Sequence, residues 1–181
     1  RQLRGEAHPQ VQVKNCGIAL AQGMGGQLGS RHGSATLILE GNKAMTTPYQ
    51  ERAFSEPVIY PDNEVLWQSA SKGILMLKRC QSCNEFHWYP RPVCPLCGSS
   101  DTVWFQASGK GTIYSVTVTR RAGPVPFALA YVTLEEGITM MSNIVDCDLD
   151  TLQIGDKVEV VFKNSPAGQA VPMFRLAQSH T

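Results

Sequence analysis

Four cysteines arranged as two close pairs constrain the fold of this 181-residue chain more than any other feature. Each pair has the spacing Cys-x2-Cys, and ten residues separate the pairs. Such a pair can form a tight turn whose backbone amides point at the sulfurs, and two facing turns complete a tetrahedral thiolate site. Pro95 inside the second pair and Gly98 after it both favour a tight turn. The predicted ligands are Cys80, Cys83, Cys94 and Cys97.

Zinc fits the predicted site best, because four thiolates form a closed tetrahedral set with no open coordination position. Iron in a similar thiolate site and two disulfides in a secreted protein are the alternatives. His87 lies between the pairs, but its neighbours Trp88 and Tyr89 indicate an ordinary residue of the ribbon. Cys16 and Cys147 lie in or beside apolar runs, so we expect both to be small core residues.

Charge is nearly balanced along the chain, with 16 Lys and Arg against 15 Asp and Glu. No block of like charge provides the broad attraction that nucleic-acid and anionic-membrane binders usually have. The longest apolar runs, such as 127–132, stop far short of the roughly 18 residues that cross a bilayer, and no signal-peptide pattern opens the chain. Because paired cysteines that suit a metal favour a reducing compartment, we expect a soluble, cytoplasmic protein.

A short helix is predicted over 63–72, directly before the cysteine pairs. Asp62 is the expected N-cap, and Gly73 is the expected C-terminal stop. A strand over 74–77 then leads into the first pair. Upstream, residues 46–61 have repeated prolines and little periodicity, which predicts an extended linker.

From residue 108 onward the hydrophobic period changes to two. Tyr114, Val116 and Val118 alternate with polar residues, as in a half-buried strand. A turn signal at 135–137 predicts a hairpin between the second and third strands. Five short strands with one longer connection between the third and fourth are typical of an OB-type Greek-key barrel. The predicted strands are 114–118, 127–134, 138–145, 158–162 and 172–177.

The first 45 residues form a separate compositional unit that is rich in small residues. Two short apolar runs, 16–21 and 34–39, flank a glycine loop that contains Gly25 and Gly26. This pattern predicts a buried β-hairpin. Because 45 residues cannot cover both faces of such a hairpin, we expect it to need a partner or a longer polypeptide.

Residues 61–178 resemble an acyl-CoA-associated family that joins a helix, a rubredoxin-like zinc ribbon and an OB-fold. The resemblance implies acyl-CoA metabolism beside a thiolase or a related condensing enzyme. The matching stretches are Leu66-Trp67, the cysteine pairs with Tyr89-Pro90-Arg91, Trp104 with Ser108-Gly109-Lys110-Gly111, Glu136-Gly137, and Leu152-Gln153-Ile154-Gly155-Asp156.

Residues 1–40 resemble the C-terminus of a thiolase, especially of the sterol-carrier-protein type. In thiolases such a glycine loop approaches the thioester, where backbone amides bind a developing oxyanion, which implies this role for Gly25 and Gly26. Around Gln22 the family usually supplies a cysteine or histidine, and this sequence supplies neither. The matching residues are Arg1 to Ala7, Ala19-Leu20-Ala21, Gly25-Gly26 and Thr36 to Glu40.

Together these patterns predict a mainly β chain: a zinc ribbon and a five-stranded OB barrel with a short N-terminal helix and a thiolase-tail-like hairpin segment. The predicted divisions are 1–45 for the thiolase-like segment, 46–61 for the linker, 62–77 for the helix and lead-in strand, 78–105 for the zinc ribbon and 106–181 for the OB-fold.

The leading functional hypothesis is a non-catalytic module that binds acyl-CoA or acts as a scaffold. It would be associated with, or fused to, a thiolase-fold enzyme, as part of an acyltransferase or lyase complex in lipid metabolism. Arg120 and Arg121 at the end of the first barrel strand are candidates for contacts with CoA phosphates, or they form a solvated loop. Independent catalysis is disfavoured, since the sequence has no nucleophile–base arrangement and no open metal site.

Single-stranded nucleic-acid binding is the rival hypothesis, because zinc ribbons and OB-folds often have this function. Residues 106–181 contain six Lys and Arg against seven Asp and Glu, whereas a groove that follows a phosphate backbone should be basic. Alternation places most of the aromatic residues of this region in the core. They are Tyr114, Phe127, Tyr131, Phe162 and Phe174.

Overall fold

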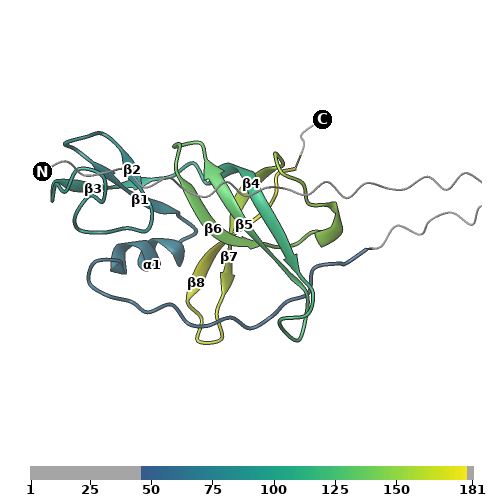
Figure 1. Ribbon diagram of the computed structural model, residues 1–181. Coiled ribbons are helices and arrows are strands. Elements are labelled where there is room, and N and C mark those ends of the chain that lie inside the picture. Colours follow the sequence, from purple (N-terminus) through teal and green to yellow (C-terminus); the bar gives the residue numbers. More distant parts are fainter. Residues whose placement is uncertain (1–45, 179–181) are drawn as a thin grey trace, which may run out of the picture. The chain divides into compact units, whose positions relative to one another are not determined.

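The structure is a computed structural model that describes residues 46–178, which belong to one compact unit, Asn42–Thr181. The predicted thiolase-like segment, with Gly25, Gly26 and Cys16, lies outside the described residues. The described part is mainly β with one short α-helix, as predicted (Figure 1). Its elements are α1 (Glu64–Ala70), β1 (Met76–Cys80), β2 (Phe86–His87), β3 (Thr102–Gln106), β4 (Lys110–Thr119), β5 (Phe127–Leu134), β6 (Thr139–Ile144), the 3-10 helix η1 (Leu149–Thr151), β7 (Lys157–Asn164) and β8 (Ala170–Leu176).

Helix α1 begins one residue later than predicted, and the expected N-cap is wrong. Asn63 occupies the N-cap position, and its side chain makes no capping hydrogen bond. That side chain is buried and holds the preceding loop: Oδ1 accepts from the Tyr60 amide at 2.8 Å, and Nδ2 donates to the Tyr89 hydroxyl at 2.8 Å. The predicted stop is confirmed, since Gly73 has a φ of +75° and its amide donates to the Ala70 carbonyl.

Three strands form a small antiparallel sheet in the order β2-β1-β3. The lead-in strand runs further than predicted, to Cys80 itself, because β3 pairs along its whole length from Met76↔Gln106 to Cys80↔Thr102. The pairing joins a segment before the cysteine pairs to a segment after them. The sequence of 74–77 by itself therefore could not predict how far the strand extends.

The remaining strands form a closed barrel in the order β4-β5-β6-β8-β7, which confirms the predicted five-stranded OB-type barrel. Neighbouring strands are antiparallel except β6 and β8, which meet in parallel at Ile144↔Phe174. The predicted hairpin turn lies between β5 and β6, where Gly137 has a φ of +85°. The predicted longer connection, between the third and fourth barrel strands β6 and β7, contains η1.

A β-bulge in β4 corrects the predicted orientation of Tyr114. Ile113 pairs with Val132, but Ser115 pairs with Tyr131, so Tyr114 is an extra residue on its strand. The bulge places Ile113 in the core at 1% exposure and leaves Tyr114 on the outer surface at 69%. Simple alternation fails here because one inserted residue reverses the facing of every residue on one side of it.

Helix α1 joins the small sheet to the barrel through one continuous core. Leu66 and Trp67 of α1 pack with Leu77 of β1 and with residues of the barrel interior. Gln169, directly before β8, donates from Nε2 to the carbonyl of Trp67 at 3.1 Å. The barrel is filled by buried side chains rather than open at its centre, as in other small barrels. They include Ile113, Val132, Met140, Ile144, Val158 and Phe174.

The segment before α1 is extended and has one isolated β-bridge, between Pro48 and Asp148. It is fastened to the barrel at both ends. The Thr47 amide donates to the Asp148 carboxylate at 2.9 Å, and Glu56 accepts from Ser165 Oγ at 2.5 Å and from the Ala167 amide at 2.7 Å. Within residues 46–178, no helix is both long enough and apolar enough to span a bilayer.

Candidate metal centre and ligand cavity

Two matched turns carry the four cysteines. The Cys80 amide donates to the Glu85 carbonyl at 2.9 Å, and the Cys94 amide donates to the Ser99 carbonyl at 2.8 Å. Directly after each pair comes a residue in the left-handed region, Asn84 at φ 63° and Gly98 at φ 77°. A tight turn was expected at Gly98 but not at Asn84, although asparagine is the residue that most readily replaces glycine in this conformation.

The four sulfur atoms meet in one cluster. They all lie within 4.8 Å of one another, with 3.6 Å between the sulfurs of Cys80 and Cys97 and 3.8 Å between those of Cys83 and Cys94. A disulfide would need about 2.05 Å. A tetrahedral ion with zinc–sulfur bonds of about 2.3 Å separates its sulfurs by about 3.8 Å, so the observed spacing fits zinc and excludes disulfides.

Backbone amides favour the thiolate form of Cys80, whereas burial and hydrogen bonds with the other thiols raise the pKa of Cys83 and of Cys97. The Cys83 amide, helped by the Ser82 amide, lowers the pKa of the Cys80 thiol to about 6, although burial acts in the opposite direction. When bound, zinc would hold the two turns together and would have no free coordination position for substrate. Cys80, Cys83, Cys94 and Cys97 therefore fit a structural zinc ion.

The other described candidates for ligation or reactivity are not part of the cluster. His87 is 4% exposed, and its Nε2 lies 3.4 Å from the Arg91 carbonyl, as an ordinary residue of the ribbon would. Cys147 packs against the core, and burial together with Asp148 and Asp146 raises the pKa of its thiol to about 11. At neutral pH this thiol is protonated and a poor nucleophile.

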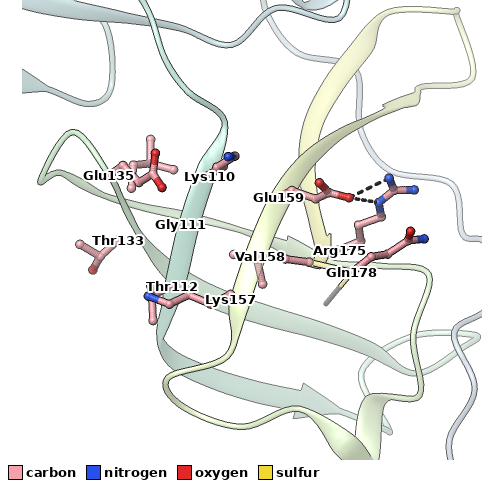
Figure 2. A pocket seen from close by; sticks show the side chains of 12 residues that line it. Lys110, Gly111, Thr112, Thr133, Glu135, Lys157, Val158, Glu159, Arg175 and Gln178 are labelled. Atoms are coloured by element: carbon pink, nitrogen blue, oxygen red, sulfur yellow. Dashed lines mark hydrogen bonds and ion pairs between the residues drawn. The ribbon is translucent and has the colours of Figure 1, made fainter. Parts of the chain in front are cut away.

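A cavity of about 650 Å³ lies where β4 pairs with β7 to close the barrel, with further lining from β5 and β8 (Figure 2). It was not predicted from the sequence, because its walls come from four strands that the barrel brings together. The lining residues are Lys110, Gly111, Thr112, Thr133, Leu134, Glu135, Lys157, Val158, Glu159, Arg175, Ala177 and Gln178.

The cavity presents two lysines that form no ion pair within residues 46–178, beside the carboxylates of Glu135 and Glu159. Arg175 is paired with Glu159 at 2.7 Å, as the dashed lines in Figure 2 indicate. Lys157 donates instead to the Thr112 hydroxyl at 2.8 Å. The ammonium of Lys110 has no hydrogen-bond or ion-pair partner among residues 46–178. The cavity can therefore accept an anionic group near Lys110 and Lys157.

The predicted arginine pair directly follows β4, as expected, but its two members differ. Arg120 forms an ion pair with Asp150, whereas Arg121 lies exposed with no ion pair in the described part of the chain. The Thr47 hydroxyl and Arg120 together lower the pKa of the Asp150 carboxyl. Arg120, one of the two candidate phosphate ligands, is thus already paired with Asp150, which also binds Thr47 of the predicted linker.

The aromatic residues of the barrel divide into three groups. Phe174 is fully buried and Phe162 packs partly against the core, as predicted, while Phe127 lies under the guanidinium of Arg52 at 3.8 Å. The prediction was wrong for Tyr114 and Tyr131, which are exposed on the outer surface at 69% and 49%.

A four-cysteine zinc ribbon joined through one helix to a five-stranded OB barrel defines the class of protein. Comparison with family models agrees with this architecture. Residues 67–103 match the rubredoxin-like zinc ribbon domain of ChsH2, and residues 104–163 match its C-terminal OB-fold domain.

Individual relatives give the same assignment. The chain is 39% identical over 93 residues to a DUF35 domain-containing scaffold protein of Methanothermobacter thermautotrophicus, a match that covers 47% of this chain and 68% of that protein. It is 32% identical over 125 residues to a probable enoyl-CoA hydratase alpha subunit of Thermomonospora curvata, and there the match covers 67% of this chain but 39% of the relative. This chain thus spans less than half of the Thermomonospora protein.

Among solved structures, a chain of the Ltp2-ChsH2(DUF35) aldolase is 31% identical to this one, with a TM-score of 0.60. The match covers 68% of this chain and 100% of that chain. This protein belongs to the DUF35 family, with the ChsH2 arrangement of a zinc ribbon followed by an OB-fold.

Proposed function

We propose that this chain is a non-catalytic, cytoplasmic scaffolding module that binds acyl-CoA and holds a thiolase-fold enzyme of acyl-CoA metabolism. The observation that carries the proposal is the match to the whole of the DUF35 chain in a structure named as an aldolase. Two further relatives are named a scaffold protein and an enoyl-CoA hydratase subunit, which supports assembly with an enzyme. The resemblance of residues 1–40 to a thiolase tail supports the thiolase fold of that partner.

The described residues support a non-catalytic role. The zinc site is closed by four thiolates, Cys147 is a protonated thiol, and the imidazole of His87 is buried. None of these groups forms the nucleophile–base pair that acyl transfer requires. Chemistry on the acyl group is therefore assigned to the partner.

Native co-purification of the full chain tests the scaffolding role. We expect a thiolase-fold enzyme of acyl-CoA metabolism to accompany it, identified by mass spectrometry, with about one zinc per chain in the same sample. Recovery of the zinc-loaded chain without such an enzyme, from cells in which both are present, would contradict the proposal.

Acyl-CoA binding is proposed at the cavity that contains Lys110 and Lys157. Two ammonium groups without an ion-pair partner in one concave site suit the phosphates of CoA, whereas Arg120 is occupied by Asp150. Replacing both lysines by alanine should weaken CoA binding about a hundredfold or more in isothermal titration, since each lost charge-assisted contact is worth about 1.5 kcal/mol or more.

The matched control is the double substitution Arg120→Ala and Arg121→Ala, which removes the same formal charge elsewhere on the barrel. It should leave CoA affinity within about twofold of the unmodified chain. The reverse result, with loss of binding only in the arginine variant, would place the phosphates at the arginine pair.

Single-stranded nucleic-acid binding remains the rival function, since exposed Tyr114 and Tyr131 could stack bases. However, Lys110 at the start of β4 is the one lysine or arginine among the outward residues of the strands that carry these tyrosines, too few for a basic groove. A high oligonucleotide affinity that falls steeply with salt would favour the rival, and we expect none.

A further inference from the structure

Strands β4, β5 and β6 are consecutive neighbours in the barrel (Figure 1). Their outward residues form one surface. The register places their side chains together, because directly opposed residues in antiparallel strands share a face. Lys110, the first residue of β4, is the one charged residue among them, and it lies at the end of the surface near Lys157. The outer face, as this surface is called below, consists of Lys110, Thr112, Tyr114, Ser115, Thr117, Thr119, Phe127, Leu129, Tyr131, Thr133, Thr139, Met141 and Asn143.

Large apolar side chains cross the middle of the outer face in a row. Ser115, next to the bulged Tyr114, pairs with Tyr131, and Tyr131 pairs with Met141. Tyr114, Tyr131 and Met141 are 69%, 49% and 58% exposed. Three such side chains side by side expose a continuous apolar area, unlike the single apolar residues found on any protein surface.

Cations lie at the two ends of the outer face and none lies at its centre. At one end Arg52 stacks on Phe127 and donates to Asn143 Oδ1 at 3.2 Å. At the other end Lys157 donates to the Thr112 hydroxyl. Neither cation has a carboxylate partner within residues 46–178. The face thus has an apolar middle between two positively charged borders.

We propose that the outer face is the surface on which the enzyme partner docks, through a patch that is apolar and uncharged at its centre and acidic at the border that carries Arg52; the border at Lys157 is part of the proposed acyl-CoA cavity. This inference rests on the proposed scaffolding function and adds the location and chemistry of the contact. Interface centres are enriched in tyrosine and methionine and depleted of charge, like the row of Tyr114, Tyr131 and Met141.

The partner cannot bind by adding a β-strand next to β5, because β4 and β6 already pair with the two edges of that strand.

A second copy of this chain fits the outer face less well. Three strands about 4.8 Å apart with about eight residues each, at about 3.4 Å per residue, cover about 400 Å². Two copies joined through this face alone would bury about 800 Å² in total, less than the roughly 1,200–2,000 Å² of stable interfaces. A larger partner can extend beyond the apolar middle and contact the charged borders. A second copy would instead place its own positive charges opposite them.

Substitution on the face tests the proposal in the co-purified complex. Tyr131→Arg should weaken the enzyme's affinity about tenfold or more, because it places a charge at the centre of an apolar contact. Tyr60→Arg is the matched control, since Tyr60 is a tyrosine of similar exposure, 59%, outside the face. It should change affinity less than about twofold, and unchanged zinc content and circular dichroism of both variants would show that they are folded.

Photo-crosslinking identifies the occupant directly. We expect p-benzoylphenylalanine in place of Tyr131 in the full chain to crosslink to the co-purified enzyme, and the same residue in place of Tyr60 not to. If the enzyme co-purifies but crosslinks only from position 60, and Tyr131→Arg retains it, the docking surface is wrong while the scaffolding function stands. Crosslinks from position 131 to a second copy, to residues 1–45 or to nucleic acid would each overturn the proposed occupant. If no enzyme co-purifies with the unmodified chain, the scaffolding function itself fails.

Discussion

The four cysteine side chains show how much a local pattern can specify. Two residues separate Cys80 from Cys83 in one turn, and the conformation of that turn follows from the short chain between them and from the left-handed residue after it. The amide of Cys83 then bonds the sulfur of Cys80 within the same turn. The metal site could therefore be predicted from spacing.

Loss of one thiolate should abolish zinc binding. Cys97→Ser removes one ligand of the closed set, and the zinc content measured by metal analysis should fall from about one per chain to near zero. Cys147→Ser is the matched control, since Cys147 lies outside the cluster, and it should retain the metal. Full zinc in the Cys97 variant would contradict the assignment of the four ligands.

Strand β4 illustrates what is decided at the level of elements. Its sequence alternates, but the bulge at Tyr114 reverses the facing of the residues on one side of it, and only the register with β5 reveals the extra residue. The strand also pairs with β7, and the three strands meet at Gly111, which pairs with Leu134 and Val158. Close approach of backbones at that point leaves no room for a side chain.

Gly111→Ala should destabilise the barrel. An added Cβ would lie 2.6 Å from Val132 Cγ1 and 2.8 Å from the Thr133 carbonyl oxygen, and the backbone atom cannot move away easily. Overpacking of this kind costs about 1–3 kcal/mol of unfolding free energy, measured by denaturant titration. Gly123→Ala is the control, because its Cβ would approach no atom closer than 3.8 Å, and we expect a change within about 0.5 kcal/mol. Equal effects of the two substitutions would be inconsistent with the close packing at Gly111.

On the scale of the whole molecule, long-range contacts convert an apparent linker into a fixed part of the structure. Prolines and weak periodicity correctly predicted an extended segment, but its hydrogen bonds to Asp148 and Ser165 join residues about a hundred positions apart. Nothing in the local sequence identifies those partners. The same holds for α1, which contacts both the ribbon and the barrel.

Glu56→Ala should release the segment from the barrel. The Ala167 amide loses its acceptor and should exchange faster with solvent, and stability should fall by about 1 kcal/mol. Glu51→Ala is the control in the same segment, since the Glu51 side chain is 85% exposed and only touches Lys163 at 4.0 Å. Unchanged exchange at Ala167 in the Glu56 variant, measured by hydrogen exchange, would contradict this anchoring.

The sequence by itself determined the four-cysteine cluster, the number of barrel strands and the hairpin between β5 and β6. Each of these depends on residues close together in the chain, where turn geometry and hydrophobic period leave few alternatives. The tertiary structure alone decided the cavity with Lys110 and Lys157, the pairing of Arg120 with Asp150, and the outer face around Tyr131. These features arise where strands distant in sequence come into register, and register is set by the packing of the whole barrel rather than by any one strand.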